Sequence, residues 1–151
     1  MNTTSYSKWY SDQHLIITCL TGLLSLDEII VWEKSLYMAL SEIPHQNTFK
    51  ILVNLHGFTA ENFDAHKRFR TIIPAVLADY GWKVGYVNLF EESAAITLTN
   101  HNGIQCVAAA HVHHDKSKID KYSELFNSEN EQFYTSPARA KTWIESIKMN
   151  Q

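Results

Sequence analysis

The chain has 151 residues, of which 45% are hydrophobic and 19% are charged. This composition excludes a disordered or linker-dominated chain and predicts a single folded domain over residues 1–151. The formal net charge of −3 gives no sign of a nucleic-acid-binding surface, and no stretch approaches the ~20 apolar residues of a membrane span.

The first predicted element is an antiparallel hairpin. Trp9 and Tyr10 indicate a short strand, residues 11–13 a turn, and residues 15–21 a second strand that Gly22 closes. The two strands must be antiparallel, because so short a connection leaves no room for a crossover.

A helix with a well-marked start comes next. Ser25 is followed three residues later by Glu28, the pattern of a capping box, and Pro44 ends the helix. Its apolar stripe consists of Leu26, Ile29, Ile30, Tyr37, Leu40 and Ile43. Residues 49–55 then form an apolar run typical of a strand covered on both faces.

A loop over residues 56–59 precedes a second helical pattern. Thr59 is a candidate N-cap, and an apolar stripe runs over residues 63–80 to a closing Gly81. Pro74 lies inside the stripe and is expected to kink the helix or split it in two.

The remaining segments continue the alternation of strands and helices. We predict a fourth strand at residues 84–90, a short helix at 91–100 and a fifth strand at 104–112. These are followed by a helix at 119–126 and a brief edge strand at Phe133 and Tyr134. A last helix starts at Ser136 and Pro137. The expected fold is α/β, with a mostly parallel sheet, an antiparallel N-terminal hairpin and flanking helices. In particular, residues 50–54, 84–89 and 105–112 are expected to run parallel to one another.

The cysteines and the N-terminal residues bear on the compartment. Cys19 and Cys106 lie in apolar runs, which predicts buried and reduced thiols. The first eight residues contain no apolar segment like that of a signal peptide. We therefore expect a soluble, cytoplasmic protein.

The last third of the chain carries a family resemblance. An apolar strand and its exit at residues 107–115 are followed by Lys121 and Tyr122, an aromatic strand at 130–134 and an Ala-x-x-Trp-Ile helix at 140–144. Together with the order of elements, this resembles the STAS fold, and in particular its SpoIIAA-like branch. The resemblance implies a non-enzymatic binding or interaction module: STAS relatives bind protein partners or nucleotides, and the related CRAL-TRIO architecture holds lipids.

One segment departs from that family. STAS antagonists that act as phospho-switches carry an Asp-Ser-Ser-Gly-type segment after the third strand. Here Thr59 is the only hydroxyl-bearing residue of the corresponding loop, and Glu61 nearby would repel a phosphate. We therefore do not expect Thr59 to act as a phospho-switch.

Polar residues follow each of the three predicted parallel strands. Because the carboxyl ends of parallel strands meet at one edge of the sheet, these residues are expected to surround a common crevice. Histidine suits such a place, since it can donate, accept or ligate. The candidate ligand-binding residues are His56, Phe58, Glu91, Glu92, His113, His114 and Asp115.

Two classes of function remain open for this edge of the sheet. The favoured one is binding of a protein partner or of a small apolar or anionic ligand, and formation of a homodimer is left open. The alternative is a metal-dependent or histidine-dependent enzyme. No spacing matches a known zinc pattern and no nucleophile motif is present, so we expect no cofactor and assign no catalytic or metal-ligating residue. The basic cluster of Lys67, Arg68 and Arg70 is interpreted as a solvated helix face.

Overall fold

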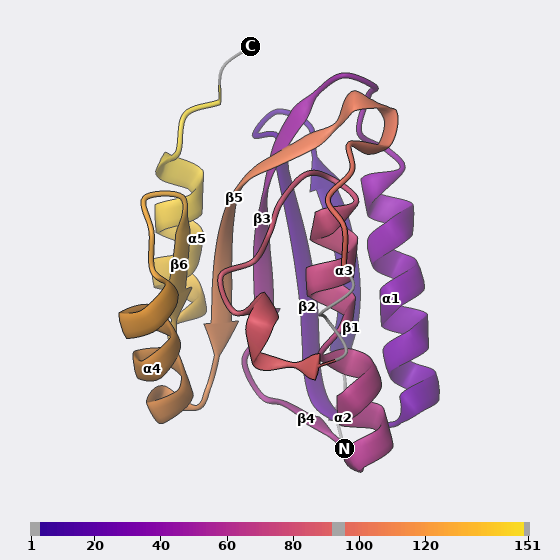
Figure 1. Cartoon of the computed structure of the whole chain (residues 1–151), viewed down its shortest axis with the longest axis vertical. Coiled ribbons are helices and arrows are strands. Elements are labelled where there is room, and N and C mark those ends of the chain that lie inside the picture. The colour runs from indigo at the N-terminus through magenta and orange to yellow at the C-terminus, as the bar shows by residue number, and fades with distance from the viewer. Residues whose placement is uncertain (1–3, 92–95, 150–151) are drawn as a thin grey trace.

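A mixed sheet of six strands forms the centre of the protein, in a computed structural model that describes residues 4–91 and 96–149 (Figure 1). The strands are β1 (Thr4–Tyr10), β2 (Leu15–Leu24), β3 (Thr48–Leu55), β4 (Phe58–Ala60), β5 (Gln105–His113) and β6 (Glu131–Tyr134). The spatial order is β1-β2-β3-β5-β6, and β4 pairs with the end of β2. Only β1 and β2 are antiparallel, which confirms the expected parallel sheet with an antiparallel N-terminal edge.

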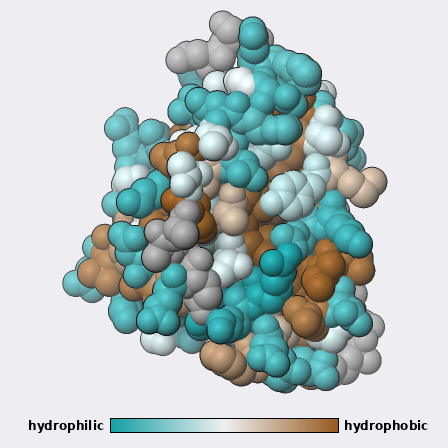
Figure 2. Space-filling model, turned by 45° about the vertical axis from the view of Figure 1, so that its right-hand side comes forward, coloured by the Kyte–Doolittle hydropathy of each residue, from teal (hydrophilic) through white to brown (hydrophobic). Residues whose placement is uncertain are grey.

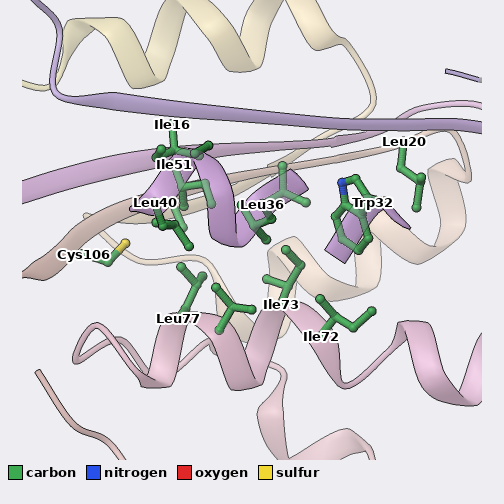
Figure 3. Packing of buried hydrophobic residues seen from close by; sticks show 14 of the residues in the cluster. Ile16, Leu20, Trp32, Leu36, Leu40, Ile51, Ile72, Ile73, Leu77 and Cys106 are labelled. Atoms are coloured by element: carbon green, nitrogen blue, oxygen red, sulfur yellow. The ribbon is translucent and has the colours of Figure 1, made fainter. Parts of the chain in front are cut away.

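Helices cover both faces of this sheet. They are α1 (Leu26–Leu40), α2 (Phe63–Phe69), α3 (Ile72–Ala78), α4 (Lys116–Phe126) and α5 (Pro137–Ser146). The larger hydrophobic cluster joins one face of the sheet to α1, α2 and α3, and a smaller cluster joins the other face to α5. Figure 3 shows Leu40 of α1 next to Ile16 and Ile51 of the strands and Trp32 of α1 on the side of Leu20, with α5 beyond the strands.

The start of α1 is confirmed, whereas part of its predicted stripe is wrong. The Glu28 N–H donates to Ser25 Oγ at 3.2 Å, and the Ser25 N–H donates to Glu28 Oε1 at 2.9 Å, so both halves of the capping box are present. Leu26 and Tyr37 are exposed, however, and Trp32 and Leu36 are fully buried instead. The buried face is therefore rotated from the predicted one.

The second helical pattern is split, as expected from Pro74. Helix α2 ends at Phe69, and α3 begins at Ile72. Pro74 lies in the first turn of α3, where a backbone N–H has no intrahelical partner and none is lost.

Thr59 does not cap the helix that follows it, and that expectation is wrong. It belongs to β4, which pairs with β2 through Leu23. The cap of α2 is Asn62, whose Oδ1 accepts the Ala65 N–H at 2.9 Å.

The predicted fourth strand over residues 84–90 is also wrong. This segment contains only a 3-10 turn at Val87–Leu89, because β5 pairs directly with β3 and leaves no place for a strand between them. Residues 92–95 of the helix expected at 91–100 lie outside the described residues, and residues 96–99 are not helical.

The C-terminal elements agree with the sequence. Strand β6 forms the edge of the sheet beside β5, and Ser136 caps α5, with Pro137 as the first helical residue. Within residues 4–91 and 96–149, no helix is long and apolar enough to cross a bilayer. On the face shown in Figure 2, hydrophobic residues lie in separate spots between hydrophilic ones.

Candidate functional site

Three predicted histidines come together at the carboxyl ends of β3 and β5. The rings of His113 and His114 stack with their centroids 4.3 Å apart, and the His56 ring lies 5.9 Å from that of His114. The Gly57 N–H donates to His114 Nδ1 at 2.9 Å, which ties the loop after β3 to the end of β5. The expectation that parallel strand ends bring these side chains together is therefore confirmed for His56, His113 and His114.

Backbone hydrogen bonds fix the tautomers of His113 and His114. The Asp115 N–H donates to His113 Nδ1 at 3.0 Å, just as that of Gly57 donates to His114. An accepting Nδ1 carries no proton, so in each neutral ring Nε2 carries the hydrogen and is a donor. Burial, together with the positive charge of Lys118, lowers the pKa of His113 to about 4, so this ring is a neutral donor at pH 7.

Asp115 has mainly a structural role. It is the N-cap of α4: its Oδ1 accepts the Lys118 N–H at 3.2 Å and the Ser117 hydroxyl at 2.8 Å. These hydrogen bonds, that of the Ser117 hydroxyl foremost, lower the pKa of Asp115, because they stabilise the carboxylate.

The other predicted residues contribute less to the site. Phe58 is a core residue, and its ring packs on Phe69 at a centroid distance of 4.5 Å. Glu91 is exposed and lines neither of the hollows described below. Glu92 lies outside the described residues.

The predicted cluster borders a shallow groove that leads to a deeper pocket. The groove runs between β4, α2 and the end of β5, and the pocket lies between α2, α3 and α4. The two hollows share His66, Phe69, His113 and Lys118. These residues therefore mark where the pocket opens.

The pocket is mostly apolar and small. Its walls are formed by Phe69, Ile73 and Pro74 of α2 and α3, by Tyr86 and Phe90 of the segment after α3, and by Ile119 and Tyr122 of α4. His111 and Val112 of β5 and Phe133 of β6 close it from the sheet. Its volume is about 60 Å³, which suits a short chain better than a bulky ligand.

Two cationic residues, Lys118 and Arg70, line the pocket. Lys118 is partly buried, its ammonium lies 5.6 Å from the Tyr122 ring centroid, and no described carboxylate lies within 4.0 Å of it. Burial lowers the pKa of Lys118, although the Asp115 carboxylate acts in the opposite direction. Arg70 lies over the Phe90 ring at 5.0 Å, and no Asp or Glu is found among the described residues that line the pocket.

A buried histidine–glutamate pair lies where the pocket meets the sheet. His111 Nε2 is 2.8 Å from Glu131 Oε2, and the two side chains are 8% and 5% exposed. Glu131 Oε1 accepts the Gly85 N–H at 2.9 Å. A Cβ on residue 85 would lie 2.7 Å from Phe126 Cβ and 3.2 Å from Glu131 Oε1, so a glycine is needed for this approach.

Most of the residues that form the pocket were not predicted from the sequence. Lys118, Tyr86 and Glu131 come from three segments that meet only in the folded chain. Two local patterns pointed toward it: Lys118 and Tyr122 are four residues apart and share a helix face, and Glu131 alternates with Phe133 on the inner face of a short strand. A glutamate on an inward face is a buried charge that needs a partner.

The donor set at the strand ends gives little support to a metal site. Among residues 4–91 and 96–149, no three His, Cys, Asp or Glu side chains are arranged to hold a metal ion. The Nδ1 atoms of His113 and His114 are occupied by backbone N–H groups, and Nε2 would have to lose its hydrogen before it could coordinate a metal.

The basic cluster of α2 is divided between two roles. Arg68 forms an ion pair with Glu33 of α1, and Lys67 is exposed. Arg70 instead belongs to the pocket.

Comparisons with known proteins identify no relative. No family model, no curated protein and no solved structure matches this chain.

Proposed function

We propose that this protein is a non-enzymatic binding module whose pocket takes a short apolar chain that carries an anionic group. The observation that supports this most is Lys118, a partly buried ammonium at the opening of an apolar pocket with no described carboxylate within 4.0 Å. A partly desolvated cation gains from an anion that replaces its lost water. The neutral His113 ring adds an Nε2–H donor beside it.

In this proposal the apolar part of the ligand lies inside the pocket. Phe69, Ile73 and Ile119 line the pocket, so a ligand that enters it meets hydrocarbon side chains. A ligand with its anionic group at Lys118 and its apolar chain inside the pocket matches both the cationic opening and the apolar walls. Small-molecule sites commonly combine apolar walls with a few polar groups in this way. The volume of about 60 Å³ favours a short chain.

We also propose that the chain is a STAS-like domain. Support comes from the antiparallel hairpin at the start, followed by parallel strands in the sequential order β2-β3-β5-β6 with helices between them. A binding module on such a domain agrees with what the family resemblance implies. A histidine-dependent enzyme at the strand ends has less support, because His113 and His114 use Nδ1 to hold backbone groups.

Pentanoate and 1-pentanol test the anionic part of the proposal, since they share a chain and differ in charge. We expect pentanoate to perturb the backbone NMR signals of α2 and α4 and to bind at least tenfold more tightly than pentanol. This ratio corresponds to one charge-assisted hydrogen bond of about 1.5–3 kcal/mol. Lys118→Gln should remove the preference.

Lys121→Gln is the matched control, because Lys121 is an exposed lysine of the same helix and does not line the pocket. It should leave pentanoate binding unchanged. Equal affinity for the two probes, no binding of either, or equal effects of the two lysine variants would each refute the proposed function.

A further inference from the structure

We infer that the His111–Glu131 pair makes the pocket select ligands with a hydroxyl group at the buried end, so that the preferred ligand class is a short ω-hydroxy acid. This inference rests on the proposed function, which supplies the anionic end of the ligand at Lys118. It adds a second polar contact in the same pocket, at His111 of β5, which also lines it.

The pair leaves one nitrogen of His111 for a ligand. Nε2 is engaged by Glu131 Oε2 at 2.8 Å, and Glu131 Oε1 is engaged by the Gly85 N–H at 2.9 Å. Both carboxylate oxygens are therefore used within the protein. His111 Nδ1 has no hydrogen-bond partner among the described residues, and the His111 ring lines the pocket.

The surroundings of His111 are otherwise aromatic. Its ring stacks on Phe133 at a centroid distance of 4.8 Å and meets the edge of the Tyr86 ring at 5.5 Å. A polar ring nitrogen among such groups is costly unless a hydrogen bond satisfies it. A ligand that brings a polar group to Nδ1 therefore gains more than one that brings only a methyl group.

A hydroxyl group fits Nδ1 in either charge state of the ring. If His111 is neutral, its Nε2–H donates to Glu131 and Nδ1 accepts a hydrogen bond from the hydroxyl. If His111 is protonated, Nδ1–H donates to the hydroxyl oxygen. Because a hydroxyl both donates and accepts, the selection does not depend on which state prevails.

The size of the pocket limits the length of this ligand. The anion remains at the opening with Lys118 and His113, and the chain crosses a space of about 60 Å³ to reach His111. A chain of three methylene groups between carboxylate and hydroxyl is a reasonable first probe. 4-Hydroxybutanoate has this length, and pentanoate differs from it only by a methyl group in place of the hydroxyl.

The test compares these two probes by NMR titration of the wild-type protein and two variants. In the wild type we expect 4-hydroxybutanoate to bind about fivefold more tightly than pentanoate, within the range of one neutral hydrogen bond. It should also shift the His111 Nδ1 resonance, whereas pentanoate should not. The double variant His111→Phe with Glu131→Gln should lose the preference, so that the two acids differ by less than about twofold in affinity.

The double substitution is chosen so that the chain keeps its fold. The introduced phenylalanine retains the stacking on Phe133, and the introduced glutamine retains an oxygen for the Gly85 N–H, whereas His111→Phe alone would leave Glu131 a buried and unpaired charge. His45→Phe is the control, since His45 is exposed and lies away from the pocket lining. The shift of the wild-type His111 resonance tests the inference even if the double variant does not fold.

The outcomes separate the two proposals. Equal affinity of the two acids in the wild type, or a preference that survives in the double variant, overturns the role of His111 and leaves the anion site intact. Binding of neither acid overturns the proposed function, and this inference with it.

Discussion

His113 illustrates how one side chain at a strand end is held by its neighbours. Its Nδ1 accepts the Asp115 N–H at 3.0 Å, and its ring stacks on His114. Burial and the positive charge of Lys118 lower its pKa to about 4, although Asp115 acts in the opposite direction. The neutral ring is therefore part of the folded structure, and protonation would cost the backbone hydrogen bond.

This lowered pKa makes stability depend on pH in a defined window. Between pH 6.5 and about 4, the unfolded chain binds a proton at His113 that the folded chain does not, so the free energy of unfolding falls as the pH is lowered through this range. His113→Asn keeps an acceptor for the Asp115 N–H and removes the titration. We expect its unfolding free energy, measured by urea denaturation, to fall less over this window than that of the wild type.

His45→Asn is the control for that experiment, because His45 is an exposed histidine outside the site. Its stability profile should run parallel to that of the wild type. If the His113→Asn profile also runs parallel, the pKa of His113 in the folded protein is not lowered, and its assignment as a neutral donor at the pocket opening fails.

At the scale of elements, the sequence predicted what local rules decide. The capping box of Ser25 and Glu28, the split near Pro74 and the Ser136-Pro137 start of α5 depend on a few adjacent residues, and each is found. The prediction of a strand at residues 84–90 is wrong, because an apolar segment can form a strand only where a neighbouring strand has an unpaired edge. The Gly85 N–H instead donates to Glu131, a contact between residues 46 positions apart that no local pattern contains.

The same distinction explains the candidate site. The gathering of His56, His113 and His114 follows from the rule that parallel strands end at one edge. The pocket, in contrast, forms only because α4 lies near α2 and α3. No local sequence pattern specifies this packing.

The link between α1 and β2 gives a prediction at this scale. The Trp32 Nε1–H donates to Thr18 Oγ1 at 2.7 Å, and both residues are fully buried. Thr18→Val keeps the shape of the side chain but leaves the indole N–H without its acceptor, and it also removes the 2.8 Å hydrogen bond between Thr18 Oγ1 and Ser7 Oγ. We expect the free energy of unfolding to fall by about 1–3 kcal/mol, as measured by urea denaturation.

Thr21→Val is the matched control in the same strand, because the Thr21 side chain is only partly buried and makes no side-chain hydrogen bond within the described part of the chain. It should change stability by less than about 0.5 kcal/mol. Equal losses for the two variants would mean that the Trp32–Thr18 hydrogen bond contributes nothing specific.

At the scale of the whole molecule, the two cysteines report on different depths of the fold. Cys106 has no exposed surface and lies in the larger hydrophobic cluster, beside Leu77 in Figure 3. Cys19 is 7% exposed and pairs with Tyr6 of the edge strand β1. Burial raises the pKa of both thiols, so neither forms a reactive thiolate readily.

Reaction with a thiol reagent should therefore require opening of the structure, and Cys106 should require the larger opening. In native buffer we expect Cys106 to react more slowly than Cys19, each measured in a variant in which the other cysteine is replaced by serine.

If Cys106 is reached only by global unfolding, its labelling rate follows the free energy of unfolding when closing is fast. Thr18→Val should then accelerate Cys106 labelling by about tenfold for each ~1.4 kcal/mol that it costs. Rapid labelling of native Cys106, or a rate that Thr18→Val leaves unchanged, would show that the core between the sheet and α3 opens locally and independently of α1.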